Sequence, residues 1–452
     1  MIDRRQFGGG MAALAFLGLA RRGEAQGQAS APALTYRSEV PGYGELVPDP
    51  LGLFDLPAGF RYSIVSRTGE PMDDGYLTPG RFDGMACFPL PRGRVALVRN
   101  HEHRITERAL GPTGGLERLE QKLRGEAVYG RDLEGNVLAG GTSTVIYDLR
   151  RGRRESQYLS LAGTLYNCAG GATPWGSWLS CEETVIGRDR AGQEHGWVFE
   201  VPARQRGLAA PLPLRGLGRF KHEAAAVDPG TGIVYLTEDE DDGLFYRFIP
   251  EVRGQLARGG RLQALALRDR PGADTRNWSD AWFAKGGSVE VHWIDLAETD
   301  NPAGDLRLRG RAAGAAVFAR GEGVHWGSNA LYFCCTSGGA ARIGQIMRLD
   351  PASNRLQLFV ESTDGLLLDY ADNLTVTPWG HLIVCEDKQG QRINYLRAVT
   401  PGGRIYTLAR LTAPTELAGV CFAPDKETMF VNAHVPGATL AVTGPWRRFR
   451  GR

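Results

Sequence analysis

The chain has 452 residues, with 61 glycines, 25 prolines and a formal net charge of +2. Charges of both signs are well mixed along it, which argues against a nucleic-acid-binding surface. No long apolar stripe with a helical period is evident, so many short strands joined by turns are favoured over a helical fold.

The first thirty residues have the features of an export signal. Arg4 and Arg5 precede a mildly apolar run at 11–20, as in twin-arginine signals. The run is too short to span a bilayer, and small residues suitable for cleavage follow it. We therefore expect 1–30 to be a segment read by the twin-arginine translocation machinery. We expect 31–452 to be a single domain, periplasmic or secreted, with no membrane insertion.

The chain contains an internal echo. Thr173 and Thr377 each begin the sequence T-P-W-G, and after four more residues Cys181 and Cys385 are each followed by two acids. Such an echo is typical of repeat architectures. Each copy predicts a tight turn and a short strand that ends in a thiol and two carboxylates.

Six units follow one pattern, in which a strand begins just after an acid or amide and a second strand ends in polar residues. The clearest unit has a strand at His222–Val227, a turn at 228–232 and a strand at Ile233–Thr237. Repeated strand pairs predict a β-propeller. Units of about 70 residues exceed the usual 40 to 50, which indicates insertions. The sequence therefore predicts an all-β, six-bladed β-propeller with long loop insertions. We expect a monomer, because a propeller needs no partner to close.

The innermost strand of each propeller blade lines the central channel, and residues just before it point toward the axis. In this chain those positions hold acids and amides: Asp83, Asn167, Glu223, Glu322, Asp372 or Asn373, and Glu416. The neighbouring strand ends add four glutamates: Glu102, Glu182, Glu238 and Glu386. Converging carboxylates repel one another in a low-dielectric channel, and cations between them remove that repulsion. The sequence therefore predicts a metal site in the channel.

The ligand types suggest a mixed metal site. Oxygen-rich clusters suit Ca²⁺, and a thiolate among them suits a softer metal such as iron or zinc. Cys181 is the candidate soft ligand, with Cys385 as its formal counterpart. The alternatives are a buried free thiol at each cysteine and, for the acids at 239–242, a solvated loop.

Several motifs resemble those of the PhoX family of alkaline phosphatases. They are the twin-arginine start, Val98–Glu102, Asn167–Gly171 leading into Ser180–Glu183, Lys221–Glu223, Leu236–Asp239 and Gly419–Asp425. The resemblance covers nearly all of the mature chain. It implies an exported six-bladed propeller that hydrolyses small-molecule phosphate esters, with a cluster of iron (Fe³⁺) and calcium (Ca²⁺) at one mouth of the channel.

Carried over by position, the resemblance makes Cys181 the iron ligand and implies acidic ligands at Glu223, Glu238 and Glu386. We expect Cys181, Glu223 and Glu386 to be catalytic. The full predicted set of metal ligands is Asn167, Cys181, Glu182, Glu223, Glu238, Glu322 and Glu386. The chain departs from the family near Glu386, where long members are expected to place a phosphate-binding arginine. Lys388 or an arginine from elsewhere would replace it.

Two other functions stay open. The first is a Ca²⁺-dependent lactonase or esterase, for which Asn167, Asn373 and Glu223 would serve as ligands. The second is a non-catalytic exported binding propeller, which the architecture allows equally. Iron content separates the phosphatase from the lactonase, and a metal-free protein without hydrolase activity would favour the binding protein.

Overall fold

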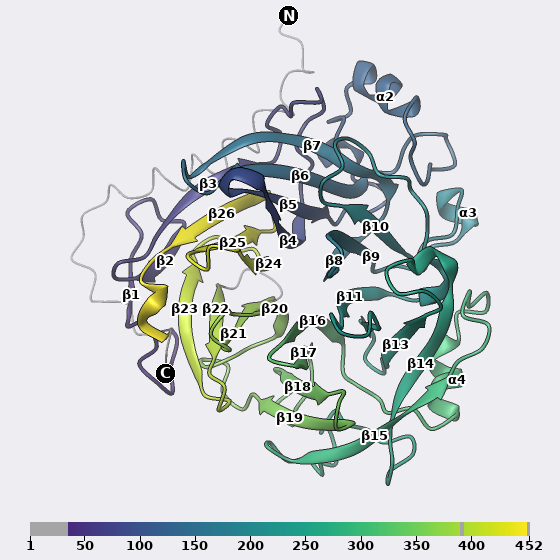
Figure 1. Ribbon diagram of the computed structural model, residues 1–452, viewed down its shortest axis with the longest axis vertical. Helices are drawn as coiled ribbons and strands as arrows, with labels where there is room; N and C mark the ends of the chain where they lie inside the picture. The colour runs from purple at the N-terminus through teal and green to yellow at the C-terminus, as the bar shows by residue number, and fades with distance from the viewer. Residues whose placement is uncertain (1–34, 389–392, 450–452) are drawn as a thin grey trace, which may run out of the picture.

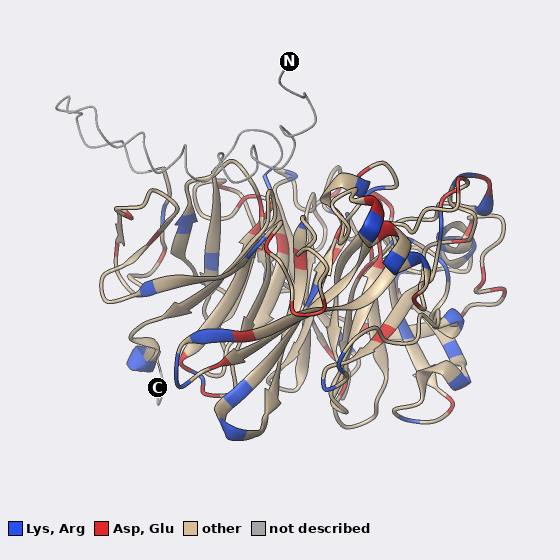
Figure 2. Ribbon diagram, turned by 90° about the horizontal axis from the view of Figure 1, so that it is seen from above, with Lys and Arg blue, Asp and Glu red and all other residues tan. Residues whose placement is uncertain are grey.

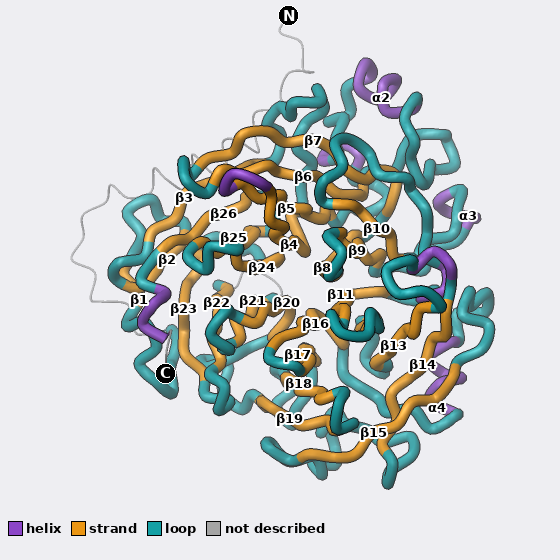
Figure 3. Tube along the Cα trace, viewed as in Figure 1, coloured by secondary structure: helices purple, strands orange, loops and turns teal. Residues whose placement is uncertain are grey.

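The computed structural model describes residues 35–388 and 393–449, so the predicted signal segment lies outside the described residues. The described chain is a ring of strands around a central axis (Figure 1), with long loops between many of them (Figure 3). The predicted all-β propeller is confirmed. The described α-helices are short: α2 (Glu117–Arg124), α3 (Arg188–Ala191) and α4 (Leu306–Ala312). Within these ranges, no helix has the length and hydrophobicity needed to cross a membrane.

The described strands form five hydrogen-bonded sheets, and four of these run outward from a single strand at the channel. The first contains β4 (Phe82–Leu90), β5 (Arg94–His101), β6 (Gly140–Asp148) and β7 (Arg153–Thr164). The second contains β8 (Asn167–Ala172), β9 (Ser177–Glu182) and β10 (Val198–Pro202). Another contains β20 (Ala371–Val376), β21 (Leu382–Glu386), β22 (Asn394–Val399), β23 (Ile405–Leu411), β2 (Phe54–Pro57) and β1 (Leu46–Val47). The last along the chain contains β24 (Leu417–Phe422), β25 (Thr428–Ala433), β26 (Ala438–Thr443) and β3 (Arg61–Arg67).

The remaining sheet has nine strands and both of its ends at the channel (Figure 1). Its order is β11 (His222–Val227), β12 (Val234–Glu238), β13 (Phe245–Pro250), β14 (Gly260–Leu267), β15 (Ser288–Asp295), β19 (Arg355–Glu361), β18 (Gln345–Asp350), β17 (Ala330–Cys335) and β16 (Gly321–Gly327). The outer strand β15 pairs with both β14 and β19. The channel is therefore lined by β4, β8, β11, β16, β20 and β24, but these belong to five sheets and not to six separate blades as the sequence suggested.

The two ends of the chain close the ring together. β3 pairs antiparallel with β26, from Arg67 opposite Ala438 to Arg61 opposite Thr443. β2 pairs with β23 in the preceding sheet. The first strands of the chain thus form the outer edges of the last two sheets.

The repeated T-P-W-G sequence makes the same turn twice. The backbone N–H of Thr173 donates to the carbonyl of Ser177 (2.8 Å), and that of Thr377 to the carbonyl of His381 (2.7 Å). In both copies the threonine hydroxyl accepts the N–H four residues later at 2.9 Å. Gly176 and Gly380 have φ of 89° and 86°, in the region that favours glycine. The echo therefore encodes a hairpin turn ahead of β9 and β21.

The core lies between neighbouring sheets. Apolar side chains from adjacent sheets pack in shared clusters, such as the one around Phe54, Tyr406, Val431 and Trp446. Acidic and basic residues are interspersed over the ribbon (Figure 2), in agreement with the mixing of both signs along the sequence. The register of each inner strand decides which of its side chains face the channel.

Candidate metal centre

Each channel-lining strand carries a β-bulge near its first residue. A bulge leaves an extra residue unpaired and re-aims its side chain. The first residues inside the six bulges are Asp83, Cys168, Glu223, Glu322, Asp372 and Gly419. We call the first five the inner ring. Five strands therefore offer a carboxylate or a thiol at the same level.

The sixth strand offers glycine for a steric reason. Gly419 has φ of 60°, and a Cβ atom there would lie 2.5 Å from the carbonyl oxygen of Asp83. Every L side chain is therefore excluded without a shift of the backbone.

A second set of residues, which we call the outer ring, directly follows the strands that pair with the inner strands. These strands end at the mouth of the channel where the inner strands begin. The first residues after β5, β9, β12, β21 and β25 are Glu102, Glu183, Asp239, Asp387 and His434. A repeated backbone hydrogen bond fixes most of them. The N–H of Glu183 donates to the carbonyl of Tyr166 (2.8 Å), and that of Asp387 to the carbonyl of Tyr370 (3.0 Å). After β17 the equivalent residue is Thr336, whose hydroxyl donates to the backbone of Ala371 (2.6 Å).

All members of the two rings except Glu223 line a cavity of about 730 Å³ at the mouth of the channel. Within the described residues, four groups have ligand atoms within 4.8 Å of one another. They are Asp83–Glu102–Glu416–His434, Cys168–Glu183–Glu223, Glu223–Glu322–Asp372 and Asp372–Asp387–Glu416. Because Glu223, Asp372 and Glu416 are each shared between groups, the four groups form one continuous cluster.

The electrostatics of this cluster fit bound cations. Burial, reinforced by the charges of Glu183, Asp372 and Asp83, raises the pKa of Glu223 well above its usual range, while the Cys168 thiol acts in the opposite direction. Neither Glu223 oxygen has a hydrogen-bond partner of good geometry among the described residues. A buried carboxylate without a partner is costly, and a cation removes that cost.

The thiol in the cluster belongs to Cys168. Burial raises its pKa well above the usual range, and the charges of Asp83 and Glu223 raise it further. A metal ion would reverse this by stabilising the thiolate. Oxygen donors with one sulfur donor thus fit a hard cation beside a softer one.

Cys181, the predicted soft ligand, lies elsewhere. It is fully buried in the apolar cluster that contains Leu179, Val198 and Leu217. The structure does not bring its thiol into any of the four groups. Cys385 is likewise buried in a hydrophobic cluster.

Three predicted glutamates are instead enclosed by hydrogen bonds. Glu182 accepts from His195 Nδ1 (2.6 Å) and from the N–H groups of Leu165 (3.0 Å), Gly196 (2.9 Å) and Trp197 (3.2 Å). Its carboxylate is therefore saturated and fixes the backbone beside β9.

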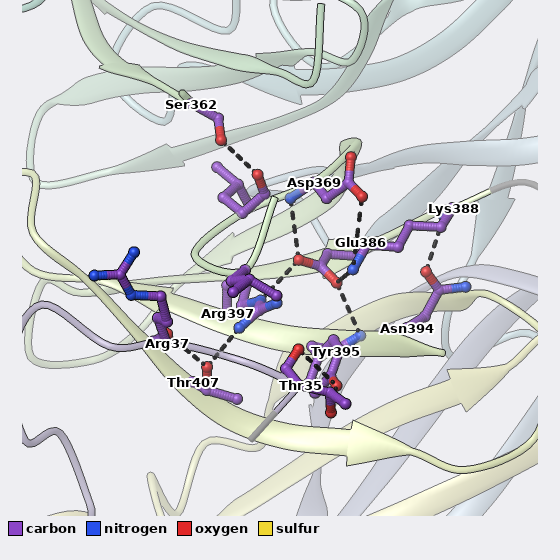
Figure 4. A network of polar contacts seen from close by, with 12 residues as sticks. Thr35, Arg37, Ser362, Asp369, Glu386, Lys388, Asn394, Tyr395, Arg397 and Thr407 are labelled. Carbon is purple, nitrogen blue, oxygen red and sulfur yellow. Dashed lines mark hydrogen bonds and ion pairs between the residues drawn. The ribbon is translucent and has the colours of Figure 1, made fainter. Parts of the chain in front are cut away.

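Glu238 and Glu386 are held in the same way. Glu238 accepts from the Tyr246 hydroxyl (2.7 Å), and burial raises its pKa to about 7. Glu386 accepts from Arg397 Nε at 2.7 Å, with Lys388 Nζ at 3.0 Å, and also from the backbone N–H of Tyr395 (Figure 4). These hydrogen bonds link neighbouring strands of one sheet, β12 to β13 for Glu238 and β21 to β22 for Glu386.

Asn167 also has a structural place. Its side-chain oxygen accepts from the Thr164 hydroxyl (2.6 Å) and its amide donates to Ser180 Oγ (2.9 Å).

Of the predicted metal ligands, the structure brings together Glu223 and Glu322 only. The residues that the predicted set omitted from the cluster are Asp83, Glu102, Cys168, Glu183, Asp372, Asp387, Glu416 and His434. The sequence did contain a signal for three of these residues. Cys168, Glu183 and Asp387 each come directly after a residue of the predicted set.

Basic groups also line the cavity. Arg320 Nε and Nη2 hold the two oxygens of Asp239 at 2.8 and 2.9 Å, and Nη2 lies 2.7 Å from Glu322. These acids raise the pKa of Arg320, so the guanidinium stays charged. Lys221 pairs with Glu240 at 3.0 Å. Arg320 directly precedes β16 and so belongs to a different sheet from Glu386. It lies beside the candidate ligands.

His222 takes no part in this cavity. Its Nε2 lies 2.9 Å from the carbonyl oxygen of Gly218, and its ring lies against Phe220. Burial lowers its pKa to about 3, so the imidazole is neutral at physiological pH. Its position is structural.

Comparisons with known proteins identify the family and the fold. The family model described as alkaline phosphatase PhoX matches residues 41–437. A search of curated proteins finds no match. Among solved structures, Pseudomonas fluorescens PhoX, in complex with the transition-state analogue vanadate, is similar over 87% of this chain and 96% of that chain, with 19% identity and a TM-score of 0.64. A Xanthomonas campestris gluconolactonase is similar over 89% and 98%, with 14% identity and a TM-score of 0.41.

The likeness to the PhoX structure concerns the fold, and the family match concerns the sequence itself. That match extends across both rings of the candidate metal centre, from Asp83 to His434. The chain therefore belongs to the alkaline phosphatase PhoX family and is a phosphatase.

Proposed function

We propose that this phosphatase hydrolyses phosphate monoesters with calcium and iron ions held by the inner and outer rings. The observation that carries the proposal is Glu223. Neither oxygen of its buried carboxylate has a hydrogen-bond partner of good geometry among the described residues, and it belongs to two of the four ligand groups. A cation is the simplest partner for it.

The two kinds of donor suggest where each ion would bind. The group Cys168–Glu183–Glu223 contains the thiol and suits iron. The all-oxygen groups that share Asp372 suit calcium. When bound, such cations supply charge that neutralises phosphoryl oxygens and Lewis acidity that favours attack on phosphorus.

Arg320 is the residue we assign to the phosphate. Asp239 and Glu322 hold Nε and Nη2, which orients the guanidinium plane. Nη1 makes no hydrogen bond within the described chain and remains available at the cavity. A fixed planar cation suits the tetrahedral oxygens of phosphate and stabilises charge that spreads over them during transfer. Arg320 would replace the arginine that family members are expected to carry near Glu386.

Elemental analysis together with hydrolysis of p-nitrophenyl phosphate tests the proposal. The protein is purified after export in its own host, and it is assayed with and without added Ca²⁺. Iron and calcium together with turnover support the proposal. Calcium without iron, with hydrolysis of lactones but not of phosphate esters, would replace it with the lactonase alternative. A metal-free, inactive protein would point to a binding propeller.

Export by the twin-arginine route is a separate proposal, supported by Arg4 and Arg5 in the sequence. A protein with both residues changed to lysine should accumulate in the cytoplasm, because that route reads the arginine pair. Fractionation followed by immunoblotting measures this. Unchanged export of the double variant would contradict it.

A further inference from the structure

Two arginines stack on the ring of one tryptophan. Arg276 and Trp278 lie in the loop between β14 and β15, and Arg342 lies in the loop between β17 and β18. The guanidinium carbon of Arg276 lies 4.2 Å from the ring centre of Trp278, and that of Arg342 lies 4.4 Å from it. Trp278 is half-buried and Arg342 is exposed. Stacking of this kind fixes a guanidinium plane at low cost in conformational entropy.

Hydrogen bonds connect this stack to the mouth of the channel. The indole N–H of Trp278 donates to the carbonyl of Ser337 (2.6 Å). Ser337 follows Thr336, whose N–H donates to the carbonyl of Arg320 (3.0 Å). The stack is therefore joined, through two consecutive residues, to the arginine that we assign to phosphate.

A second set of contacts ties the stack to the outer ring. Arg276 Nη1 donates to the carbonyl of Asp241 (3.0 Å), two residues after Asp239. The N–H of Gly339 donates to the carbonyl of Arg276 (2.8 Å). The stack thus bridges the loops that follow β12 and β17, both of which leave their strands at the mouth.

The two arginines differ in charge balance. Arg276 holds both oxygens of Asp274, at 2.8 and 2.6 Å, so its charge is neutralised. No carboxylate of the described chain lies within 4 Å of Arg342. Arg342 also has φ of 56°, a conformation that is uncommon for a side chain of its size. Arg342 is therefore an oriented cation without a carboxylate partner among the described residues, in the loop that leaves β17 at the mouth of the channel.

We propose that Arg342, held by Trp278, binds an anionic group on the alcohol portion of the phosphate ester. This rests on the proposed function, because Arg320 and the metal ions would hold the phosphoryl group that is transferred. The preferred substrates are then monoesters whose alcohol carries a carboxylate or a second phosphate. A guanidinium recognises either group through two parallel hydrogen bonds. Arg342 is thus a specificity-determining residue.

The test compares two esters that differ in one group. 3-Phosphoglycerate carries a carboxylate where glycerol 3-phosphate carries a hydroxymethyl group. In the metal-loaded protein, Arg342→Ala should lower kcat/KM for 3-phosphoglycerate about fivefold, the upper range for an exposed ion pair. It should leave glycerol 3-phosphate and the metal content unchanged. The difference should disappear at about 1 M salt, where charges are screened within about 3 Å.

Two kinds of control separate recognition from folding. Trp278→Ala should reproduce the selective loss and Trp278→Phe should retain most of the preference, because phenylalanine keeps a ring under the guanidinium. Arg206→Ala removes another exposed arginine, after β10 at the face opposite the mouth, and should change neither substrate. An equal loss on both esters, or no loss, would overturn the inference. Failure of the metal-loaded wild type to hydrolyse either ester would instead overturn the proposed function, before any variant is compared.

Discussion

Glu182 and Glu183 are consecutive in the chain, but their carboxylates face different surroundings. Glu182 is fully buried and accepts hydrogen bonds from His195 and three backbone N–H groups. Glu183 lines the cavity, where burial and the charge of Asp239 raise its pKa well above the usual range. Glu182 fixes the strand end, and Glu183 lies among the candidate metal ligands.

Amide substitutions should separate these two roles. Glu182→Gln should lower the free energy of unfolding by about 3 kcal/mol, because a buried carboxylate that accepts several hydrogen bonds is replaced by a group that must also donate. Glu183→Gln should leave the stability of the metal-free protein unchanged or higher, since it removes a repelled charge. It should lower turnover about 100-fold through loss of metal. Denaturant unfolding and elemental analysis measure both; the reverse pattern of effects would contradict this division of roles.

The two cysteines give a second matched pair. Cys168→Ser should remove most of the iron and the associated turnover, because an alcohol is a poor replacement for a thiolate on a soft metal. Cys181→Ser should retain the metals and cost about 1 to 3 kcal/mol of stability, because a hydroxyl is then buried among apolar side chains. Iron retained in the Cys168 variant and lost in the Cys181 variant would restore the assignment made from sequence.

Metal removal should destabilise the protein. A chelator would expose the carboxylates of the cluster to their mutual repulsion, and ions at about 1,000 times their dissociation constant contribute about 4 kcal/mol to stability. The melting temperature should fall and should recover when the ions are returned.

Glu223→Gln supplies the control for that experiment. The variant should be more stable than the wild type without metal, because the buried charge is gone, and it should respond less to the chelator. A melting temperature that the chelator leaves unchanged in the wild type would contradict structural metal ions.

Arg320 should act on the phosphate. Arg320→Ala should lower kcat/KM for phosphate monoesters by about 100-fold or more, and Arg320→Lys should recover part of the loss, since it keeps charge but not the planar fork. Arg307→Ala is a suitable control, because Arg307 pairs with Asp242 at 2.8 Å and does not line the cavity. If the Arg320 variants bind inorganic phosphate as the wild type does, the assignment is wrong.

The sequence predicts the architecture well because hairpin turns and strand ends are local features. The T-P-W-G turns and the acids at the start of four of the inner strands could be read without knowledge of distant contacts. For the same reason Asp83, Glu223, Glu322 and Asp372 were placed at the channel correctly. The merging of two sheets through β15 depends on a distant pairing with β19, which no local pattern encodes.

Strand register explains the site residues that the sequence misplaced. Side chains alternate between the two faces of a strand, so an error of one residue selects the wrong face. Glu182, Glu238 and Glu386 were chosen where Glu183, Asp239 and Asp387 face the cavity. At the inner ring the bulges make the same uncertainty worse, since an inserted residue shifts the alternation within the strand. Cys168 was missed beside Asn167 for this reason.

The pairing of β3 with β26 has a consequence for biosynthesis. Residues 61–67 leave the ribosome well before their partner at 438–443, because several hundred residues separate the two strands. The ring cannot close before β26 has been made, and until then the spacing between Asp83 on β4 and His434 after β25 is not fixed. The candidate metal centre is therefore complete only after the ring has closed, so its inner and outer rings come together late in folding.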